Sequence, residues 1–409
     1  MKYIILVGDG MGDFPLKELE GRTPLEAALT PGMDFVAQHG ILGLVQTVPQ
    51  GMEPGSDVAN MSLLGYRPES QYTGRGPIEA ASLGIQLRPE DVAFRCNLVT
   101  LERRDEHLIM ADYSAGHIST EEAHKLIEEL NNHLASDKLF LHPGKSYRHI
   151  LVWRGGPEGI KTYPPHDLLG RDIYEAWQVY EEEPVLRDFL IKAMAFLEKH
   201  PINQQRRSQG KLPANSLWPW GQGRFPRLEP FKNKWGLPGA VVAAVDLIKG
   251  LGVLAGLEII DVPGATGYLD TNYEGKALAA IDALSEHDFV FVHVEAPDEA
   301  SHEGDLDLKL RAIQDFDRYV VRTVLEEATA RLKEYRLLVV TDHLTPLSLR
   351  THASKPVPFA IYDSRQTEVK RATGYGESSA KETDLFMPNG EELLKLFLER
   401  EPQIELDAK

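Results

Sequence analysis

The stretch FVFVHVEAPDEASH, residues 289–302, places a run of large apolar side chains directly before a cluster of acids and a histidine. Its first part, Phe289 to Val294, has the length of one β-strand. A nearly continuous apolar run of that length is typical of a strand that is buried on both faces of a parallel sheet. Asp298 and His302 follow, four residues apart, so they lie on one face of a helical turn and can both reach a single ion. The stretch therefore predicts a buried strand that ends at a metal site.

Two further apolar runs have the same form and also end at candidate ligands. Tyr3 to Val7 precedes Asp9, and Leu337 to Val340 precedes Asp342 and His343. In parallel sheets, ligands bind beyond the carboxyl ends of the strands. We therefore expect the polar side chains that follow all three runs to gather at one edge of a sheet.

Helical patterns alternate with these strands. The expected helices are Leu25 to His39, Gly239 to Leu251, Lys276 to Leu284 and Leu306 to Tyr335. Alternating strands and helices predict an α/β domain with a doubly wound, mostly parallel sheet.

The middle of the chain lacks the regular alternation of strands and helices, and its mixed pattern predicts a smaller inserted α+β domain. We place this domain at residues 118–212, so that residues 1–117 and 213–409 form the larger domain. The expected elements are a helix at Thr120 to Leu134, a strand at His149 to Trp153, a Pro-rich loop at Tyr163 to Leu169, a helix at Pro184 to His200 and a polar stretch at Gln204 to Lys211.

Composition excludes several classes of protein. The net charge of -18 argues against a nucleic-acid partner, because such partners require a basic face. One cysteine, Cys96, allows no internal disulfide and fits a reducing compartment. The apolar start, Tyr3 to Val7, is too short for a signal peptide, and charges interrupt the apolar stretch Gly239 to Ile260. We expect a cytoplasmic protein without a membrane span.

The acids and histidines together indicate a centre for two divalent metal ions. The candidate ligands are Asp9, Asp298, His302, Asp342, His343 and His352. The adjacent Asp342 and His343 point apart, which suits two neighbouring ions better than one. Carboxylate oxygen and imidazole nitrogen suit manganese, zinc or similar ions. Taken singly, an acid at a strand end is usually a helix cap and a lone histidine usually faces solvent. Only their combination at three strand ends predicts a metal site.

Ser56, in the stretch Pro54-Gly55-Ser56-Asp57, is the candidate nucleophile. Because it follows a glycine and precedes an amphipathic run, its alternative role is a helix N-cap. No histidine or lysine adjoins it, so metal coordination would have to lower the pKa of its hydroxyl. Amides at a helix N-terminus would stabilise an anion there.

These motifs resemble the cofactor-independent (2,3-bisphosphoglycerate-independent) phosphoglycerate mutases of the alkaline phosphatase superfamily. The archaeal-type branch, which has bacterial members, matches best, over nearly the whole chain. The matching motifs are Gly8 to Asp13, Pro54 to Asp57, Tyr72 to Pro77, Phe94 to Asn97, Asp112 to Gly116 and His293 to His302.

The resemblance implies an alkaline-phosphatase-like fold whose inserted domain closes over the substrate as a cap. It implies two ions, usually manganese, with zinc, cobalt and magnesium as alternatives. One ion would be held by Asp298, His302 and His352, and the other by Asp9, Asp342, His343 and Ser56. The implied activity is an isomerase that interconverts 3- and 2-phosphoglycerate in glycolysis and gluconeogenesis. Ser56 would carry the phosphoryl group as phosphoserine, and a homo-oligomer is compatible with the family.

Substrate contacts are expected from basic side chains, because a phosphate dianion and a carboxylate both suit arginine. The candidates are Arg75, Arg95, His117, Arg148 and Lys276. Each has an ordinary alternative: a turn arginine in solvent for Arg75, surface strand residues for Arg95 and Arg148, and a helix-capping context for His117. Lys276 corresponds to a lysine near the site in the family.

One stretch departs from the family. Residues 218–223, Trp-Pro-Trp-Gly-Gln-Gly, stand where the archaeal-type mutases carry an arginine-containing Gly-rich segment. A related bacterial branch with this loop is associated with homoserine kinase activity, as part of threonine biosynthesis, so a homoserine kinase is one alternative function. A phosphomonoesterase on the same site is another. Trp218 and Trp220 could equally be core residues between the domains.

Overall fold

A computed structural model describes residues 1–134, 136–366 and 373–399 of the 409-residue chain. The chain forms two compact units, and each is considered by itself. The sheet unit comprises Met1–Tyr72 and Arg227–Lys409, and the inserted unit comprises Thr73–Pro226. The boundaries expected from the sequence, residues 118 and 212, both fall inside the inserted unit. This unit begins earlier because the strand at residues 92–104 pairs with strands of the inserted unit, which the local sequence does not reveal.

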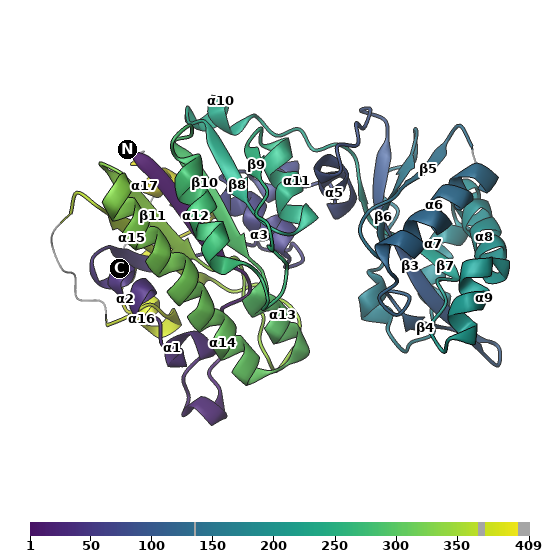
Figure 1. The fold of residues 1–409 in the computed structure, drawn as a ribbon, viewed down its shortest axis with the longest axis horizontal. Coiled ribbons are helices and arrows are strands. Elements are labelled where there is room, and N and C mark those ends of the chain that lie inside the picture. The colour runs from purple at the N-terminus through teal and green to yellow at the C-terminus, as the bar shows by residue number, and fades with distance from the viewer. Residues whose placement is uncertain (135, 367–372, 400–409) are drawn as a thin grey trace. The chain divides into compact units, whose positions relative to one another are not determined.

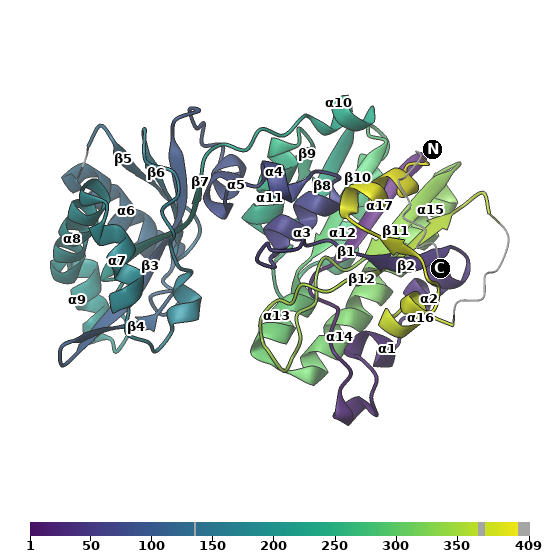
Figure 2. The ribbon, with the colours of Figure 1, turned by 180° about the vertical axis from the view of Figure 1, so that it is seen from behind.

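The sheet unit contains an eight-stranded sheet in the order β13-β2-β12-β11-β1-β10-β8-β9. Figure 1 labels the strands β8, β9, β10 and β11 of this sheet. The strands are β1 (Lys2–Gly8), β2 (Ile41–Val45), β8 (Gly239–Val242), β9 (Glu258–Ile260), β10 (Phe289–Val294), β11 (Tyr335–Val340), β12 (Val357–Asp363) and β13 (Phe386–Met387). Among the described strands of this sheet, only β12 runs antiparallel to its neighbours, which are β11 and β2. Figure 2 shows these three strands close together from behind. The predicted doubly wound, mostly parallel sheet is confirmed.

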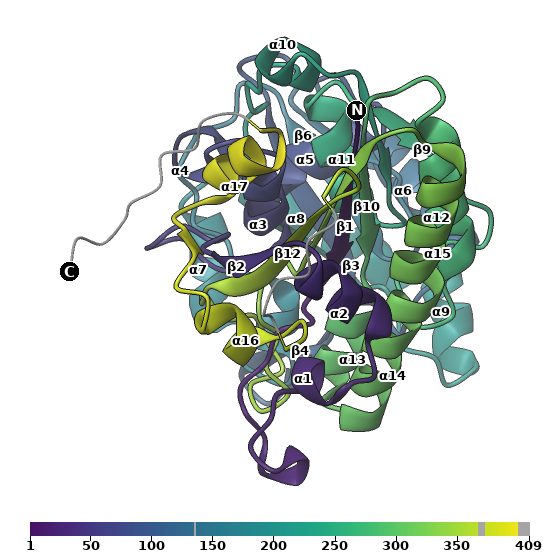
Figure 3. The ribbon, with the colours of Figure 1, turned by 90° about the vertical axis from the view of Figure 1, so that its left-hand side faces the viewer.

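Helices cover both faces of this sheet. They are α1 (Pro24–Ala27), α2 (Pro31–Gln38), α3 (Ser56–Leu63), α4 (Pro68–Gln71), α10 (Phe231–Trp235), α11 (Asp246–Leu254), α12 (Tyr273–Ala283), α13 (Ala296–Glu303), α14 (Leu306–Phe316), α15 (Arg322–Arg331), α16 (Glu377–Lys381) and α17 (Gly390–Phe397). Figure 3 shows α12 and α15 on one side of the sheet and α3 and α17 on the other. This double cover explains why the central strands are apolar on both faces.

The register of the three central strands brings their carboxyl ends to one level. β1 lies between β10 and β11, with Gly8 beside Val294 and Val7 beside Val340. Ile4 is fully buried between Val290 and Leu337 in the core under α2, α12 and α14. The residues that follow each strand therefore emerge side by side.

The inserted unit is an antiparallel sheet with helices, in agreement with the expected α+β texture. Its strands are β3 (Val92–Arg104), β4 (His107–Asp112), β5 (Leu139–His142), β6 (Arg148–Trp153) and β7 (Ser216–Gly223), and its helices are α5 (Arg75–Ser82), α6 (Thr120–Leu134), α7 (Tyr174–Glu181), α8 (Pro184–Lys199) and α9 (Pro201–Ser208). The long strand β3 pairs with β4, β6 and β7. Trp218 and helices α6 and α8 contribute to one apolar core of this unit.

Several expected helices are divided in the structure. Pro31 separates α1 from α2 within the range Leu25 to His39, because it begins a new helix at its first position. A π-helical turn separates α14 from α15, and the chain has already entered β11 at Tyr335. The range Gly239 to Leu251 begins as strand β8, a short apolar run that periodicity cannot distinguish from a helix. The polar stretch Gln204 to Lys211 is largely the helix α9.

No helix in the described part of the chain is long and apolar enough to cross a membrane.

Shortening one buried side chain of the central strand β1 should destabilise the sheet unit. Ile4 is fully buried, so Ile4→Ala is expected to lower the free energy of unfolding by about 2–5 kcal/mol, through lost burial and a residual cavity. Leu29→Ala is the matched control, because 75% of Leu29 is exposed and its loss should change stability by less than about 0.5 kcal/mol. Urea denaturation measures both, and equal effects would contradict this account of the core.

Candidate metal centre

The candidate ligands lie on segments that follow the three central strands. Asp9 follows β1 directly, Asp342 and His343 follow β11, and Asp298 lies in the first turn of α13 after β10. His352 lies in the loop that leads to β12. The aligned register of the strands thus delivers side chains from distant parts of the sequence to one edge of the sheet, as the sequence predicts.

Two groups of ligand atoms form there, and each is compact enough for one ion. Ligand atoms of Asp9, Asp342 and His343 lie within 4.8 Å of one another, and so do those of Asp298, His343 and His352. His343 belongs to both groups, so the two candidate sites are neighbours. A pair of adjacent ions suits this arrangement better than a single ion.

His302 extends the second group. Its Nε2 lies 3.1 Å from Asp298 Oδ2 and 3.1 Å from His352 Nε2. Its Nδ1 lies 2.9 Å from the carbonyl oxygen of Arg350, which orients the ring so that Nε2 faces the group. His352 is held in the same way, with Nδ1 at 3.2 Å from the carbonyl oxygen of Pro54.

Ser56 lies at the first group. Its hydroxyl oxygen is 3.1 Å from His343 Nε2 and 3.5 Å from Asp9 Oδ2. Gly55, not Ser56, occupies the N-cap position of α3, so capping does not explain the serine. The structure thus brings together all seven residues that the sequence nominated for the nucleophile and the metal ligands.

Burial and charge crowding dominate the electrostatics. Burial, together with Asp342 and Asp298, raises the pKa of Asp9 well above its ordinary value. Burial also lowers the pKa of His343 to about 4, so its ring is neutral and free to act as a ligand at neutral pH. Burial opposes ionisation of Asp298, but hydrogen bonds with His302 and His352 hold its pKa well below the ordinary value.

The residues present fit a divalent cation. Asp9 Oδ1 is buried and accepts no hydrogen bond from any described residue. A buried carboxylate oxygen without a donor is costly, and a cation would satisfy it. The donor set of carboxylates and imidazoles is that of zinc or manganese.

Several supporting side chains were not singled out from the sequence. Asn60 on α3 donates a hydrogen bond to Asp342 Oδ2 at 2.8 Å, and Thr345 donates one to Asp298 Oδ1 at 2.5 Å. The absence of a side chain at Gly10 leaves room for Asp298 and Thr345, since a Cβ there would lie 2.5 Å from Asp298 Oδ1 and 2.6 Å from Thr345 Oγ1. Neutral hydroxyl and amide groups give no sequence signal of this role, because many serve ordinary structure.

His293 is another residue for which the sequence predicts no role, although it is the first residue of the motif His293 to His302. Its Nε2 lies 3.4 Å from Asp9 Oδ2, and its Nδ1 lies 3.1 Å from Glu295 Oε1. Lys276 is fully buried beside them and donates hydrogen bonds to the carbonyl oxygen of His293 and to Glu295 Oε2. Lys276 therefore neutralises an internal acid, and we do not include it among the substrate contacts proposed below.

Two of the arginine candidates of the inserted unit, Arg75 and Arg95, lie beside one acid. Glu79 on α5 accepts hydrogen bonds from Arg75 and Arg95. Arg95 is buried, not on the surface, while the side chain of Arg75 is 33% exposed. Both guanidinium groups lie over the ring of Trp220, at 5.5 Å for Arg75 and 5.9 Å for Arg95. Trp220 thus packs in the core of this unit and orients both arginines.

The remaining two candidates of the inserted unit are exposed. Arg148, at the start of β6, lies over the ring of Tyr147 at 5.1 Å. The ring of His117 lies edge-on to the same tyrosine at 6.1 Å. Ser119 accepts the hydrogen bond from Glu122 N in the first turn of α6, so His117 does not cap that helix.

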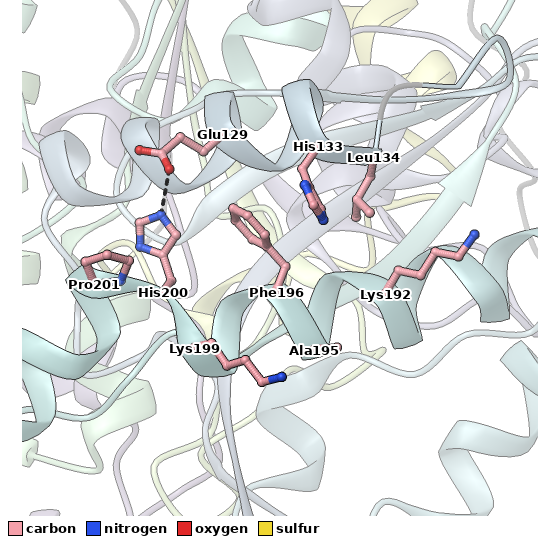
Figure 4. A pocket seen from close by; sticks show the side chains of 9 residues that line it. All are labelled: Glu129, His133, Leu134, Lys192, Ala195, Phe196, Lys199, His200 and Pro201. Carbon is pink, nitrogen blue, oxygen red and sulfur yellow. Dashed lines mark hydrogen bonds and ion pairs between the residues drawn. The ribbon is translucent and has the colours of Figure 1, made fainter.

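A groove of about 590 Å³ lies between α6 and α8 in the inserted unit (Figure 4). None of the candidate site residues line it. A hydrogen bond of 2.9 Å between Glu129 and His200 crosses it, and the rings of His133 and Phe196 stack within it. These contacts join the two helices, so the groove has a structural explanation.

Comparisons with known proteins identify the family. The sequence model of the 2,3-bisphosphoglycerate-independent phosphoglycerate mutases matches residues 37–203. The enzyme of that name from Methanosarcina barkeri is 50% identical over 97% of this chain and 99% of its own length. A probable enzyme of the same name from Geobacter sulfurreducens is 49% identical over 98% of this chain and 100% of its own length.

Two solved structures share the fold of this chain. A protein from Pyrococcus horikoshii is 31% identical with a TM-score of 0.81, and the match covers 98% of both chains. The cofactor-independent phosphoglycerate mutase of Thermoplasma acidophilum is 29% identical with a TM-score of 0.63, over 98% of this chain and 99% of that one.

Adding Mn²⁺ to the metal-free chain should raise its midpoint of thermal unfolding, because a ligand that binds only the folded state stabilises it, by about 2.7 kcal/mol at a concentration of 100 times Kd. Asp298→Asn should lose part of this rise, since it removes charge from one of the two ligand groups. Glu334→Gln, at an exposed acid of the same unit, should keep it. Differential scanning fluorimetry after EDTA treatment makes the measurement, and an unchanged midpoint in the unsubstituted chain would contradict the metal centre.

Proposed function

We propose, because the chain belongs to the 2,3-bisphosphoglycerate-independent phosphoglycerate mutase family, that Ser56 carries the phosphoryl group between the two hydroxyls of glycerate. The family makes the chain an isomerase that acts on 3- and 2-phosphoglycerate. The observation that supports Ser56 as the carrier is the position of its hydroxyl, 3.1 Å from His343 Nε2 and 3.5 Å from Asp9 Oδ2.

In the first step, Ser56 Oγ loses its proton and forms a bond to phosphorus, while the bond from phosphorus to the substrate oxygen breaks and that oxygen takes up a proton. The product is phosphoserine and glycerate. In the second step, the other hydroxyl of glycerate loses its proton and attacks the same phosphorus, and the serine oxygen leaves and is protonated again. No external phosphate donor is consumed, so the net reaction is an isomerisation.

The metal ions proposed here are manganese. Asp298, His302 and His352 would hold one ion, and Asp9, Asp342 and His343 the other, with Ser56 beside it. When bound, such ions lower the pKa of a hydroxyl and neutralise the charge on phosphoryl oxygens. His343, neutral because burial lowers its pKa, offers a lone pair without first losing a proton. Ser56 is the first residue of α3, where free backbone amides favour an anionic group.

Arginines of the inserted unit are the proposed contacts for the anionic substrate. Arg75 is the leading one, since Glu79 and Trp220 fix its guanidinium while part of the side chain remains exposed. Arg148 and His117 are exposed and can take part as well. Arg95 is buried against Glu79, so its proposed role is to hold that acid and through it Arg75.

The tryptophan-containing stretch does not favour a kinase. Trp218 is fully buried in the core of the inserted unit, and Trp220 packs against Arg75 and Arg95. Relatives at 49–50% identity over nearly the whole chain carry the mutase name. We therefore place the reaction in glycolysis and gluconeogenesis, with the cytoplasm as the proposed compartment.

Removing the nucleophile tests the proposal. Ser56→Ala should lower kcat for conversion of 3- to 2-phosphoglycerate by at least about 10³-fold, because it removes the hydroxyl that is proposed to carry the group. The assay couples 2-phosphoglycerate to enolase, with Mn²⁺ and without ATP or bisphosphoglycerate. Ser70→Ala, at an exposed serine on α4, is the control and should keep wild-type turnover.

The same assay separates the alternatives. Retained turnover by Ser56→Ala would remove Ser56 from its role. Net release of inorganic phosphate by the unsubstituted chain would indicate a phosphatase. ATP consumption that requires homoserine, without phosphoglycerate turnover, would indicate the kinase.

The substrate contact of Arg75 has its own test. Arg75→Lys keeps the charge but loses the planar pair of donors, so KM for 3-phosphoglycerate should rise about tenfold, the effect of about 1.4 kcal/mol. Arg103→Lys, at an exposed position on β3, serves as the control. An unchanged KM in Arg75→Lys would show that other side chains bind the substrate.

A further inference from the structure

We propose that the buried side chain of Lys309 is a positioning group for the metal centre, because its ammonium ties together the two loops that carry Asp9, Asp342 and His343. This inference rests on the two-metal site proposed above. It concerns a lysine on α14 that contacts none of the proposed ligands directly.

The ammonium of Lys309 is fully buried and has three acceptors. It lies 3.1 Å from the carbonyl oxygen of Gly12, 2.9 Å from Asp13 Oδ2 and 2.9 Å from the carbonyl oxygen of Thr345. A lysine ammonium has three donors, so each has an acceptor. The ammonium therefore has no donor left for solvent or substrate, so its role is to hold other parts of the protein in place.

The three acceptors belong to two different loops. Gly12 and Asp13 follow Asp9 in the loop after β1, and Thr345 follows His343 in the loop after β11. Asp13 strengthens the connection, since its Oδ2 also accepts a hydrogen bond of 3.1 Å from Leu347 N in the second loop. Lys309 and Asp13 thus fasten the loops to each other just beyond the proposed ligands.

The connection extends to the second ligand group through Thr345. While its carbonyl oxygen accepts from Lys309, its hydroxyl donates to Asp298 Oδ1 at 2.5 Å and lies 3.2 Å from His343 Nδ1. A shift of Thr345 would therefore move a partner of both metal groups. Hydrogen-bond partners behind metal ligands set ligand orientation and affect affinity.

The chain offers a matched control elsewhere in the sheet unit. Arg336 is also a buried cation that pairs with an acid, Asp363, at 3.4 Å. It also donates to two backbone carbonyls, those of Leu396 and Phe397. Because it lies near the start of β11, it is at the opposite end of that strand from Asp342. Its removal should weaken the fold as the removal of Lys309 does, without touching the ligand loops.

The experiment compares Lys309→Met with Arg336→Met in the full chain. Urea denaturation in EDTA measures the stability of each metal-free protein, and calorimetric titration with Mn²⁺ measures affinity. Both variants should be less stable than the unsubstituted chain. Only Lys309→Met should bind Mn²⁺ more weakly, by about tenfold or more. Asp13→Asn, which keeps the size of the side chain, should weaken Mn²⁺ binding in the same direction and replaces Lys309→Met if that variant does not fold.

Two results would overturn the positioning role of Lys309. One is an unchanged affinity for Mn²⁺ in Lys309→Met, or in Asp13→Asn if that variant is used instead. The other is an equal loss of Mn²⁺ affinity in Arg336→Met. Such results leave the metal centre intact, since the unsubstituted chain still binds Mn²⁺. Failure of the unsubstituted chain to bind Mn²⁺ would remove the metal centre, and this inference with it.

Discussion

The carboxylates of Asp9, Asp298 and Asp342 lie in one buried region of the sheet unit. The repulsion between their charges must be offset for the fold to be stable there. Burial and the neighbouring acids raise the pKa of Asp9 above its ordinary value, because both disfavour its charged form. Asp298 has two histidines and Asp342 has Asn60 and a backbone amide. The unsatisfied Oδ1 of Asp9 lies beside His343, at 3.4 Å, where a cation would complete the charge balance.

The sheet supplies this crowding through its register. Because Gly8, Val294 and Val340 end adjacent parallel strands, the residues that follow them must share a small volume. Double burial of these strands keeps water away from the ends, so the charges are poorly screened. The same geometry that produces repulsion between acids makes a strong site for divalent ions.

Much of this arrangement follows from the sequence, and the limits have physical causes. Phe289 to Val294 is predicted as the strand that the structure contains, because the run is short and consists mainly of aromatic and β-branched side chains, which favour a strand over a helix. Asp298 and His302 are correctly predicted to lie on one face of a helix, because they are four residues apart. Lys309 could not be found in this way, since a lysine within an amphipathic helix usually faces solvent and only long-range packing buries it. The limits of the inserted unit also depend on long-range pairing, in which β3 joins β6 and β7.

Two buried lysines behind the site help to explain its charge. Lys276 pairs with Glu295, and Lys309 pairs with Asp13, so these interior acids need no metal. That leaves three carboxylates, Asp9, Asp298 and Asp342, to be matched by ions. Two divalent cations would exceed three carboxylates by one positive charge, provided that the ligand histidines are neutral. A small positive excess beside the Ser56 hydroxyl would attract a phosphate dianion without trapping it, because the remaining negative charge requires contacts from outside the metal groups. Arginine side chains such as Arg75, the substrate contact proposed above, would meet that requirement, because a guanidinium binds a phosphate or carboxylate with two parallel hydrogen bonds.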